Sequence, residues 1–442
     1  MLSDALSNLL KIPDLRKRLW FTMVMLAIYR VGSHIPVPGV DPAGLARFWG
    51  AAGATGVFGM LDMFSGGAFA KFSLFALGIM PYINASIILQ LLTVVFPDSL
   101  GKLAKEGEAG RQQITKYTRY LTVALAALQG SGLTWYMMQQ SEGYGVIPNP
   151  GTRFFLVTVL SLSAGTAFIM WVGEQITEQG IGNGISILIS AGIIAGAPNG
   201  LAQTWRLISE GDITVPFVGV LIALMVAATA ATVIMTLGQR KIPIQYARQI
   251  RGRKVYGGTS QFLPLRVNAA GVIPVIFAQA LLSLPTMLGG FIGAANDPGS
   301  IAGRIFGWLM PGAFMYETLF VLGIVFFTFF YTAIVINPEE LAENLKKHGG
   351  SIPGIRPGKP TSQHIEWIIM RITMAGALFL ALICLLPQIL ITRFGVPFYF
   401  GGTALLIVVG VQLDTIKQME SFLLTRHYDG FLKKGQIKGR RG

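Results

Sequence analysis

The sequence predicts an all-α polytopic membrane protein with ten transmembrane helices in two pseudo-symmetric, inverted five-helix halves. Of its 442 residues, 52% are hydrophobic and only 13% are charged, whereas soluble domains carry about 25% charged residues. Ten apolar stretches approach the roughly 20 residues that a spanning helix needs. Lys and Arg concentrate in alternate connecting segments, as expected for a chain that crosses a membrane repeatedly.

The N-terminal stretch, residues 1–20, alternates apolar and polar residues at helical spacing and ends in a basic cluster. No apolar core with a small-residue cleavage site precedes the first span, so we expect an amphipathic helix on the membrane face rather than a signal peptide. The expected spans are 20–37, 76–96, 118–138, 153–172, 183–200, 215–236, 270–291, 316–336, 368–390 and 397–416.

The basic residues predict the orientation of the chain. The N-terminus, the C-terminal tail and four loops (97–119, 173–182, 237–268 and 337–366) together hold 27 of the 35 Lys and Arg residues. This asymmetry places both termini in the cytoplasm. The net charge of +14 therefore reflects topology and does not indicate a nucleic-acid enzyme.

The number of spans also predicts symmetry. Ten spans with both ends on one side divide into five and five, and an odd number per half gives the halves opposite orientations. This is typical of inverted repeats with a working site between the halves. We expect halves at 1–210 and 211–442, joined near 201–214.

The spans contain few ionisable groups. Asp414 and Glu317 lie near span ends, and Glu174 and Glu178 at a loop edge, whereas ion-coupled carriers keep such groups at mid-membrane. One cysteine, Cys384, and four scattered histidines give no disulfide framework and no metal site. We expect no catalytic residue, no cofactor and no enzyme activity.

Two glycine-rich stretches have the wrong form for a nucleotide site. GIRPGKP (354–360) is one residue short of a phosphate-binding loop and has Pro where Ser or Thr should bind magnesium. GIGNG (180–184) is more simply the flexible start of a helix. If the protein consumes energy, a partner must supply it.

The second span is imperfect. Gly78 and Pro81 interrupt its first turns, and a short glycine-broken apolar stretch, MFSGGAFAKFS (63–73), precedes it. Its polar residues are Asn84, Ser86 and Gln90. Irregular backbone at membrane depth is tolerated only where it faces protein or water. These side chains therefore face an interior seam or make ordinary hydrogen bonds between helices.

Two cytoplasmic loops are long. Residues 238–268 mix seven Lys and Arg with Tyr246, Tyr256 and strand-forming residues, which suits a projecting hairpin that docks on an acidic partner, RNA included. The alternative is a solvated loop that only sets topology. In residues 346–366, three prolines within eight positions predict a stiff contact surface, with Arg356 as its projecting contact.

The sequence resembles the SecY family, whose members form the central subunit of the Sec protein-conducting channel, over nearly its whole length. The motifs that carry this resemblance are MFSGGAFAKFSLFALGIMPYINASIILQLL (63–92), EQITEQGIGNGISILISAGI (174–193), QYARQIRGRKVY (245–256), LPLRVNAAGVIPVIFA (263–278), PGIRPG (353–358) and FGGTALLIVVG (400–410).

The resemblance implies four sets of functional residues. A plug at about 62–74 contains Phe64, Ser65, Gly66, Gly67, Ala68 and Phe69. A lateral gate between the second and seventh helices contains Asn84, Ser86, Gln90, Asn268 and Gln279. A hydrophobic pore ring contains Ile83, Ile87, Ile185, Ile189, Ile276 and Ile407. Partner contacts fall on Arg248, Arg251, Arg253, Lys254 and Arg356.

The implied function is a channel that passes unfolded secretory polypeptides across the inner membrane and releases hydrophobic segments laterally into the lipid bilayer. The implied partners are the membrane subunits SecE and SecG, the ATPase SecA, a translating ribosome with its RNA, and signal sequences. Two alternatives remain: a small-solute transporter with inverted repeats, for which no charged midplane site is visible, and a structural scaffold for membrane assembly.

Overall fold

The computed structural model describes residues 12–52, 56–211, 214–246, 249–251, 254–256, 260–291, 301–394 and 402–434. The chain folds into two compact units. Unit 1 consists of Met1–Leu201, Ser283–Pro311 and Val411–Gly442, and unit 2 consists of Ala202–Leu282 and Gly312–Gly410. Unit 1 thus holds most of the expected N-terminal half and two segments of the expected C-terminal half.

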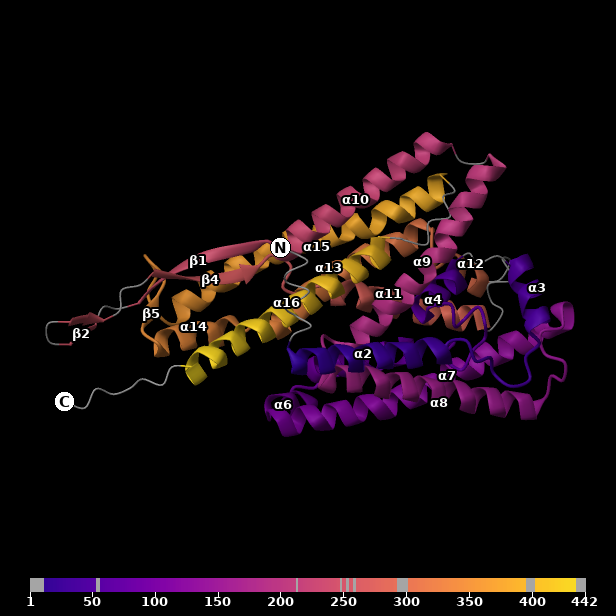
Figure 1. Ribbon diagram of the computed structural model, residues 1–442, viewed down its shortest axis with the longest axis horizontal. Coiled ribbons are helices and arrows are strands. Elements are labelled where there is room, and N and C mark those ends of the chain that lie inside the picture. The colour runs from indigo at the N-terminus through magenta and orange to yellow at the C-terminus, as the bar shows by residue number, and fades with distance from the viewer. Residues whose placement is uncertain are drawn as a thin grey trace. The chain divides into compact units, whose positions relative to one another are not determined.

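Helices dominate the first part of the chain (Figure 1). In chain order they are α2 (Pro13–Gly32), α3 (Pro42–Ala52), α4 (Gly56–Ser65), α5 (Met80–Val95), α6 (Leu100–Lys105), α7 (Glu108–Tyr144), α8 (Thr152–Gln179) and α9 (Gly184–Glu210). Helix α7 packs against both α5 and α8, and α2 packs against α8. Helix α12 (Ile301–Trp308) also belongs to this unit.

The core of unit 1 surrounds the irregular turn between α4 and α5. The turn contributes Phe69 and Phe72, which are almost completely buried. Apolar side chains from α3, α7 and α8 cover them. The cluster comprises Val37, Leu45, Phe48, Phe69, Phe72, Ala76, Leu77, Ala126, Leu133, Met137, Val146, Ile147, Phe154, Leu162 and Met287. Because each large buried apolar side chain contributes about 1.5–3 kcal/mol, this turn is firmly held.

The middle and later chain combine helices with a small sheet. The helices are α10 (Val215–Leu237), α11 (Ile273–Phe291), α13 (Phe314–Val335), α14 (Pro338–Lys347), α15 (Lys359–Phe394) and α16 (Gly402–Lys434). The strands are β1 (Gln239–Tyr246), β2 (Gln249–Arg251), β3 (Lys254–Tyr256), β4 (Ser260–Arg266) and β5 (Gly350–Ser351).

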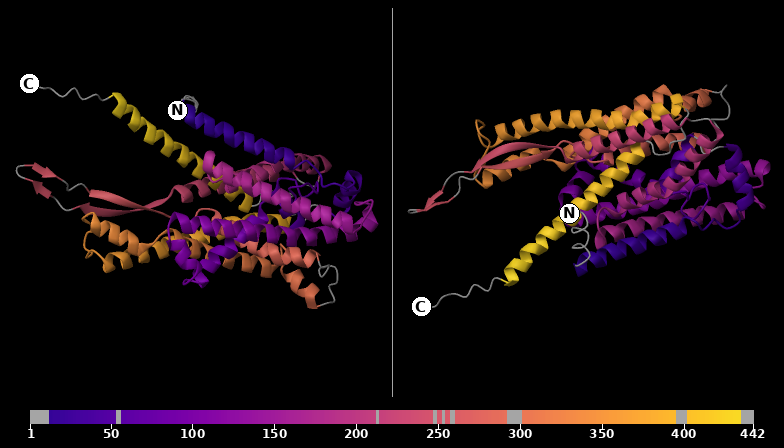
Figure 2. Two further views of the ribbon diagram at one scale, coloured as in Figure 1. Left: turned by 90° about the horizontal axis from the view of Figure 1, so that it is seen from below. Right: turned by 45° about the horizontal axis from the view of Figure 1, so that its top comes forward.

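The loop after α10 is a β-hairpin, as its pattern predicted. Strand β1 pairs antiparallel with β4 on one side and with β5 on the other, and β2 pairs with β3. Figure 2 shows the hairpin extending past α14 and α15 within unit 2. Pro264 opposes Lys241 from the edge strand β4, a position where the missing N–H of proline is tolerated.

The base of the hairpin is anchored by its own apolar cluster. Ile242 of β1 and Leu265 of β4 pack with Ile352, Ile365 and Ile368 from the following loop and α15. The sheet and the proline-rich loop before α15 are therefore one structural element, which gives that loop a defined shape.

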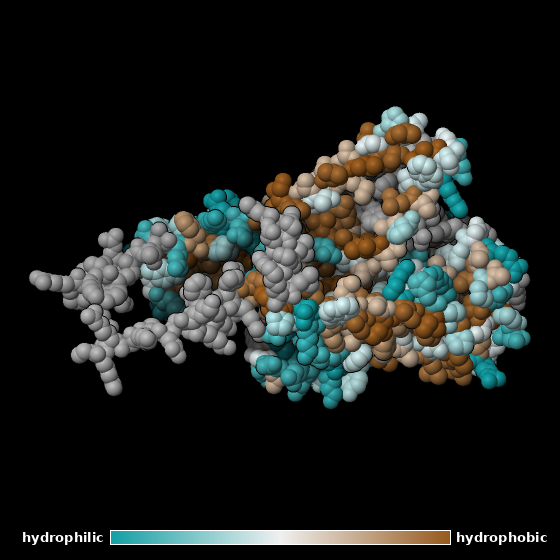
Figure 3. All heavy atoms as spheres, viewed as in Figure 1, coloured by the Kyte–Doolittle hydropathy of each residue, from teal (hydrophilic) through white to brown (hydrophobic). Residues whose placement is uncertain are grey.

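Each of the ten expected spans overlaps one helix among the described residues: α2, α5, α7, α8, α9, α10, α11, α13, α15 and α16. Five of these, α8, α9, α10, α13 and α15, are long and apolar enough to cross a membrane, and α5 and α11 are shorter apolar helices. On the face shown in Figure 3, hydrophobic residues cover α10 and hydrophilic residues gather near α6.

Two helix boundaries differ from the expectation. Helix α2 runs unbroken from Pro13 to Gly32, so residues 13–20 continue into the first span instead of forming a separate surface helix; residues 1–11 lie outside the described part. Helix α5 begins at Met80, with Pro81 in its first turn, where proline's missing N–H costs nothing.

Candidate functional site

The short helix before the second span, α4, ends at Ser65. Gly66 and Gly67 have φ angles of +68° and +83°, a left-handed conformation that glycine adopts readily and that stops a right-handed helix. The expected helix at 62–74 is therefore an earlier helix, 56–65, followed by turns up to the start of α5. The apolar residues after Gly67 belong to the turn because the core in unit 1 buries them.

Two side chains of α2 hold the end of α4. The Tyr29 hydroxyl donates to the Ser65 carbonyl oxygen at 3.1 Å. The Arg30 Nη1 donates to the Gly66 carbonyl oxygen at 2.6 Å. Hydrogen bonds from charged donors are shorter and stronger than neutral ones. We call these two bonds the α2 latch.

A glycine contact seats the same end of α4 on α9. A Cβ added at Gly66 would lie 2.9 Å from the Gly192 Cα, whereas a Cβ at Gly67 would meet nothing within 4 Å. The two backbones touch only because both residues lack side chains. The end of α4 is therefore held by the α2 latch and by the close backbone contact between Gly66 and Gly192.

Two further bonds join α4 to the turn that follows it. The Asp62 carboxylate accepts from the Ala70 N–H at 2.7 Å, and the Ser65 hydroxyl oxygen accepts from the Phe69 N–H at 3.0 Å. Burial raises the pKa of Asp62, while the Ala70 N–H and the charge of Lys71 oppose that rise. These bonds shape the turn without tying α4 to another helix.

The turn itself is locked in place. The Val37 N–H donates to the Phe72 carbonyl, and the Leu74 N–H donates to the Ile35 carbonyl, both at 3.0 Å. The Phe75 ring stacks between Tyr29 and Phe168. The segment expected as a plug thus has two parts: the end of α4, held by the α2 latch, and a turn built into the core.

The expected pore isoleucines lie on four helices, α5, α9, α11 and α16. Ile83 and Ile87 lie one turn apart on α5, and Ile185 and Ile189 lie one turn apart on α9. The last two, Ile276 and Ile407, lie on α11 and α16 in unit 2. Five are buried, and Ile185 is half-buried where it covers Gly173 of α8.

The expected gate residues fall in two groups. On α5, Asn84 is buried and neither of its amide atoms has a partner among the described residues, whereas Gln90 donates to Ser86 at 3.1 Å. In unit 2, Gln279 donates to the Tyr316 hydroxyl at 2.9 Å, and the Oδ1 of buried Asn268 has no described partner. Unpaired buried amides cost about 1–3 kcal/mol each, so Asn84 and Asn268 remain open to further contacts.

The expected partner contacts sit on the hairpin and the proline-rich loop. Arg251 and Lys254 oppose each other across β2 and β3, and Arg248 and Arg253 lie outside the described residues. Arg356 is exposed, and its carbonyl accepts from the Thr361 hydroxyl at 2.9 Å at the start of α15.

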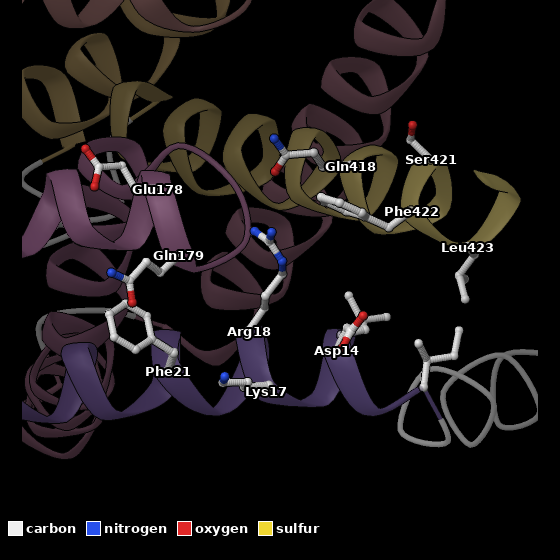
Figure 4. A pocket seen from close by; sticks show the side chains of 12 residues that line it. Asp14, Lys17, Arg18, Phe21, Glu178, Gln179, Gln418, Ser421, Phe422 and Leu423 are labelled. Carbon is white, nitrogen blue, oxygen red and sulfur yellow. The ribbon is translucent and has the colours of Figure 1, made fainter. Parts of the chain in front are cut away.

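A pocket of about 760 Å³ lies beside the start of α2, and residues of α8 and α16 complete its wall. In Figure 4, Arg18 of α2 extends toward Gln418 and Phe422 of α16, with Glu178 and Gln179 of α8 nearby. Arg18 donates to the Gly180 carbonyl at 3.1 Å, and its guanidinium lies 5.2 Å from the centre of the Phe422 ring.

The GIGNG loop is hydrogen-bonded rather than loose. The Ile181 N–H donates to the Thr22 hydroxyl, the Gly182 N–H to the Gln418 side chain, and the Gly184 N–H to the Thr177 hydroxyl. Its donors are therefore committed, so the loop does not present them to a phosphate. The stretch leads directly into α9, which begins at Gly184, so it is the start of a helix as expected, and side chains from distant helices complete it.

The sequence patterns missed the α2 latch, Asp62 and an ion pair between α7 and α8. In that pair, two nitrogens of Arg119 contact the Glu174 carboxylate at 2.8 and 2.9 Å. This bidentate geometry is typical of strong ion pairs. The available signal for the latch was Arg30, a lone arginine within an expected apolar span, since such residues need a partner.

This chain matches known proteins over most of its length. The model of the family described as SecY matches residues 73–416. The proteins named protein translocase subunit SecY from Aquifex aeolicus and Escherichia coli K12 are 46% and 45% identical to this chain. They align with 98% and 96% of this chain, and with 100% and 96% of their own lengths.

Solved structures show the same fold. One described as a protein-conducting channel has a TM-score of 0.63 at 18% identity, covering 92% of each chain. Sec61 in a canine ribosome–channel complex has a TM-score of 0.59 at 18% identity and the same coverage. The fold is thus that of a polytopic helical membrane protein. The chain belongs to the SecY family.

Proposed function

We propose that this protein is a protein-conducting channel, not an enzyme, which passes unfolded secretory polypeptides across the inner membrane and releases hydrophobic segments laterally into lipid. Membership of the SecY family supports this function. The single structural observation that carries it is α4, a ten-residue helix. It is too short to span a membrane, and among its described residues the end is held by two hydrogen bonds from α2 and by a glycine contact with α9.

In the resting state α4 closes the channel as a plug. Residues 64–66 lie at its latched end, and 67–69 form the start of the anchored turn. Opening requires the loss of the α2 latch and the Gly66–Gly192 contact, while Phe69 and Phe72 stay in the core. A ligand that binds the open position more tightly than the closed one can supply the free energy of breaking these contacts and shift the plug between two positions.

The six isoleucines form the constriction through which the polypeptide passes. Burial of five of them supports an interior position. A ring of apolar side chains can resist ions by dewetting without charged gates. Because isoleucine offers no hydrogen bond, the ring does not retain any particular passing side chain.

The lateral gate lies between α5 and α11. A signal sequence inserts there and replaces apolar contacts with equally apolar ones, so opening costs little. The amide of Asn84 and the Oδ1 of Asn268, which have no described partner, support a seam whose polar groups form hydrogen bonds when a polypeptide or water enters it. The two halves, 1–210 and 211–442, would then separate as oppositely inserted bundles.

Energy and direction come from partners. Both termini and the long loops face the cytoplasm, where SecA or a translating ribosome, through its protein and RNA, binds the hairpin and Arg356. SecE and SecG complete the membrane complex. Solved structures of this fold include channels in complex with ribosomes, which supports a ribosome as a partner.

The function is tested by reconstitution. Purified chain in liposomes, with the membrane subunits that co-purify, should import an unfolded secretory precursor when SecA and ATP are added. Uptake of small solutes without any partner, and no precursor import, would overturn the proposal in favour of a secondary transporter.

Changing Arg356→Glu should reduce partner-driven import at least tenfold, because reversing an exposed charge on a shaped loop replaces attraction to an acidic partner with repulsion. Precursor import with SecA measures the effect. Lys346→Glu is the matched control, since it reverses an exposed charge on neighbouring α14. Normal import by Arg356→Glu would remove this residue from the contact surface.

Changing Gly66→Ala should destabilise the closed plug more than Gly67→Ala does. Both variants place a side chain on a left-handed residue, at a cost of about 1 kcal/mol, but only the Gly66 Cβ meets another backbone, 2.9 Å away. Ion conductance across a planar bilayer measures the leak. Equal leaks from the two variants would show that the contact with Gly192 does not seat the plug.

A further inference from the structure

Helix α15 carries a charged side chain inside its apolar segment. Arg371 is the fourth residue of the expected span 368–390, about 5 Å along the helix axis from its start. Its side chain is exposed, and so are those of Trp367, Met370, Met374 and Leu378 on the same side of the helix. No described residue covers these side chains, as expected of a helix face in contact with lipid.

Arg371 folds back along the helix onto Trp367. The guanidinium carbon lies 3.7 Å from the centre of the indole ring, and the centre of the stacked His364 ring lies 6.1 Å from that of the indole. Helical side chains point toward the N-terminus, which here is the cytoplasmic end of the span. The arginine thus extends its charge from the apolar layer toward the headgroup layer, where tryptophan is also enriched.

The charge lacks a counterion in the described part of the chain. Arg371 takes part in none of the ion pairs described there. On its own helix the nearest carboxylate in sequence is Glu366, five positions earlier and exposed. On α14, which packs against α15, Glu343 is paired with Lys347 at 3.0 Å, while Glu339 and Glu340 lie in the first turn.

We propose that His364, Trp367 and Arg371 form a binding site for the phosphate of an anionic phospholipid on the outer face of α15. The guanidinium has a planar set of donors suited to a phosphate, and the ring beneath it fixes the plane of those donors. A lipid with net negative charge supplies the missing counterion, and its acyl chains lie along Met374 and Leu378. The site is independent of the proposed channel role.

Native mass spectrometry of the detergent-purified chain, with its co-purifying subunits, tests the site by titration with phosphatidylglycerol and phosphatidylcholine. Arg371→Gln should weaken the tightest phosphatidylglycerol site about five-fold, the contribution of one basic residue near an anionic lipid, and leave phosphatidylcholine binding unchanged. Lys346→Gln, which removes an exposed charge outside the span, should change neither.

Two more variants keep the test decisive if Arg371→Gln accumulates poorly. Arg371→Lys keeps the charge but loses the planar donors, and Trp367→Leu removes the supporting ring; each should weaken phosphatidylglycerol binding about two-fold. Unchanged binding in these variants, or equal loss of both lipids, would overturn the site.

Inorganic phosphate is the final probe. Millimolar phosphate should not displace the lipid, because the free anion has no acyl chains to bind along α15. Displacement would overturn the lipid site in favour of a free-anion site. Loss of an acidic co-purifying membrane subunit from Arg371→Gln, with lipid binding intact, would instead show that a protein carboxylate is the partner.

Discussion

The double variant Arg30→Ala, Tyr29→Phe is expected to leak ions in the resting state, because it removes both hydrogen bonds of the α2 latch. The neutral bond contributes about 1 kcal/mol, and the bond from the charged guanidinium about 1.5–3 kcal/mol. A total near 3 kcal/mol corresponds to a roughly hundred-fold larger fraction of displaced plug. Single-channel recording without partner or precursor measures the open fraction directly.

The control for this experiment is Arg153→Ala. Arg153 is exposed in the first turn of α8, so its loss removes a membrane-edge charge without touching α4. The single variants separate the two bonds, with Arg30→Ala expected to leak more than Tyr29→Phe. A double variant that is as tight as the parent protein would show that α4 does not close the channel, or that the latch does not hold it.

The substitution Ile407→Asn is expected to increase the export of precursors with weakened signal sequences about ten-fold. Ile407 is completely buried, and an amide there gives water a hydrogen-bonding site in a constriction that otherwise resists it by dewetting. A buried amide without a partner also costs about 1–3 kcal/mol, which penalises the closed state. Export of a reporter carrying a defective signal sequence measures the effect.

Ile383→Asn is the matched control for that substitution. Ile383 is also buried in unit 2, on α15, but it is not one of the six pore isoleucines. General destabilisation would affect both variants alike and lower their abundance. If Ile407→Asn exports the defective reporter no better than the parent protein, or if Ile383→Asn exports it equally well, the result would count against the pore ring.

The long spans and the hairpin could be predicted from the sequence because local patterns determine them. Apolar runs near 20 residues predict helices whatever their neighbours, and the β-branched and basic alternation of 238–268 predicts paired strands. The boundaries of α4 could not be predicted in this way. Its apolar residues continue past Gly67, and only the tertiary core decides that Phe69 and Phe72 belong to a turn.

The functional contacts were less visible for the same reason. The α2 latch joins residues 36 positions apart, and the GIGNG loop is completed by Gln418, 236 positions away. No short-range pattern encodes such pairs. The six isoleucines, by contrast, were placed by resemblance to the family, and the structure adds the burial of five of them and the one-turn spacing of two pairs.

The most direct test is disulfide crosslinking of a secretory polypeptide that is stalled halfway through the protein. With Cys384 replaced by alanine, single cysteines are placed at Ile87 and Ile189, and at the exposed positions Leu160 and Leu382 as controls. A cysteine in the stalled segment should crosslink to the two isoleucine positions and to neither control. Crosslinks at Leu160 or Leu382, with none at Ile87 and Ile189, would contradict a polypeptide path through the interior of this protein.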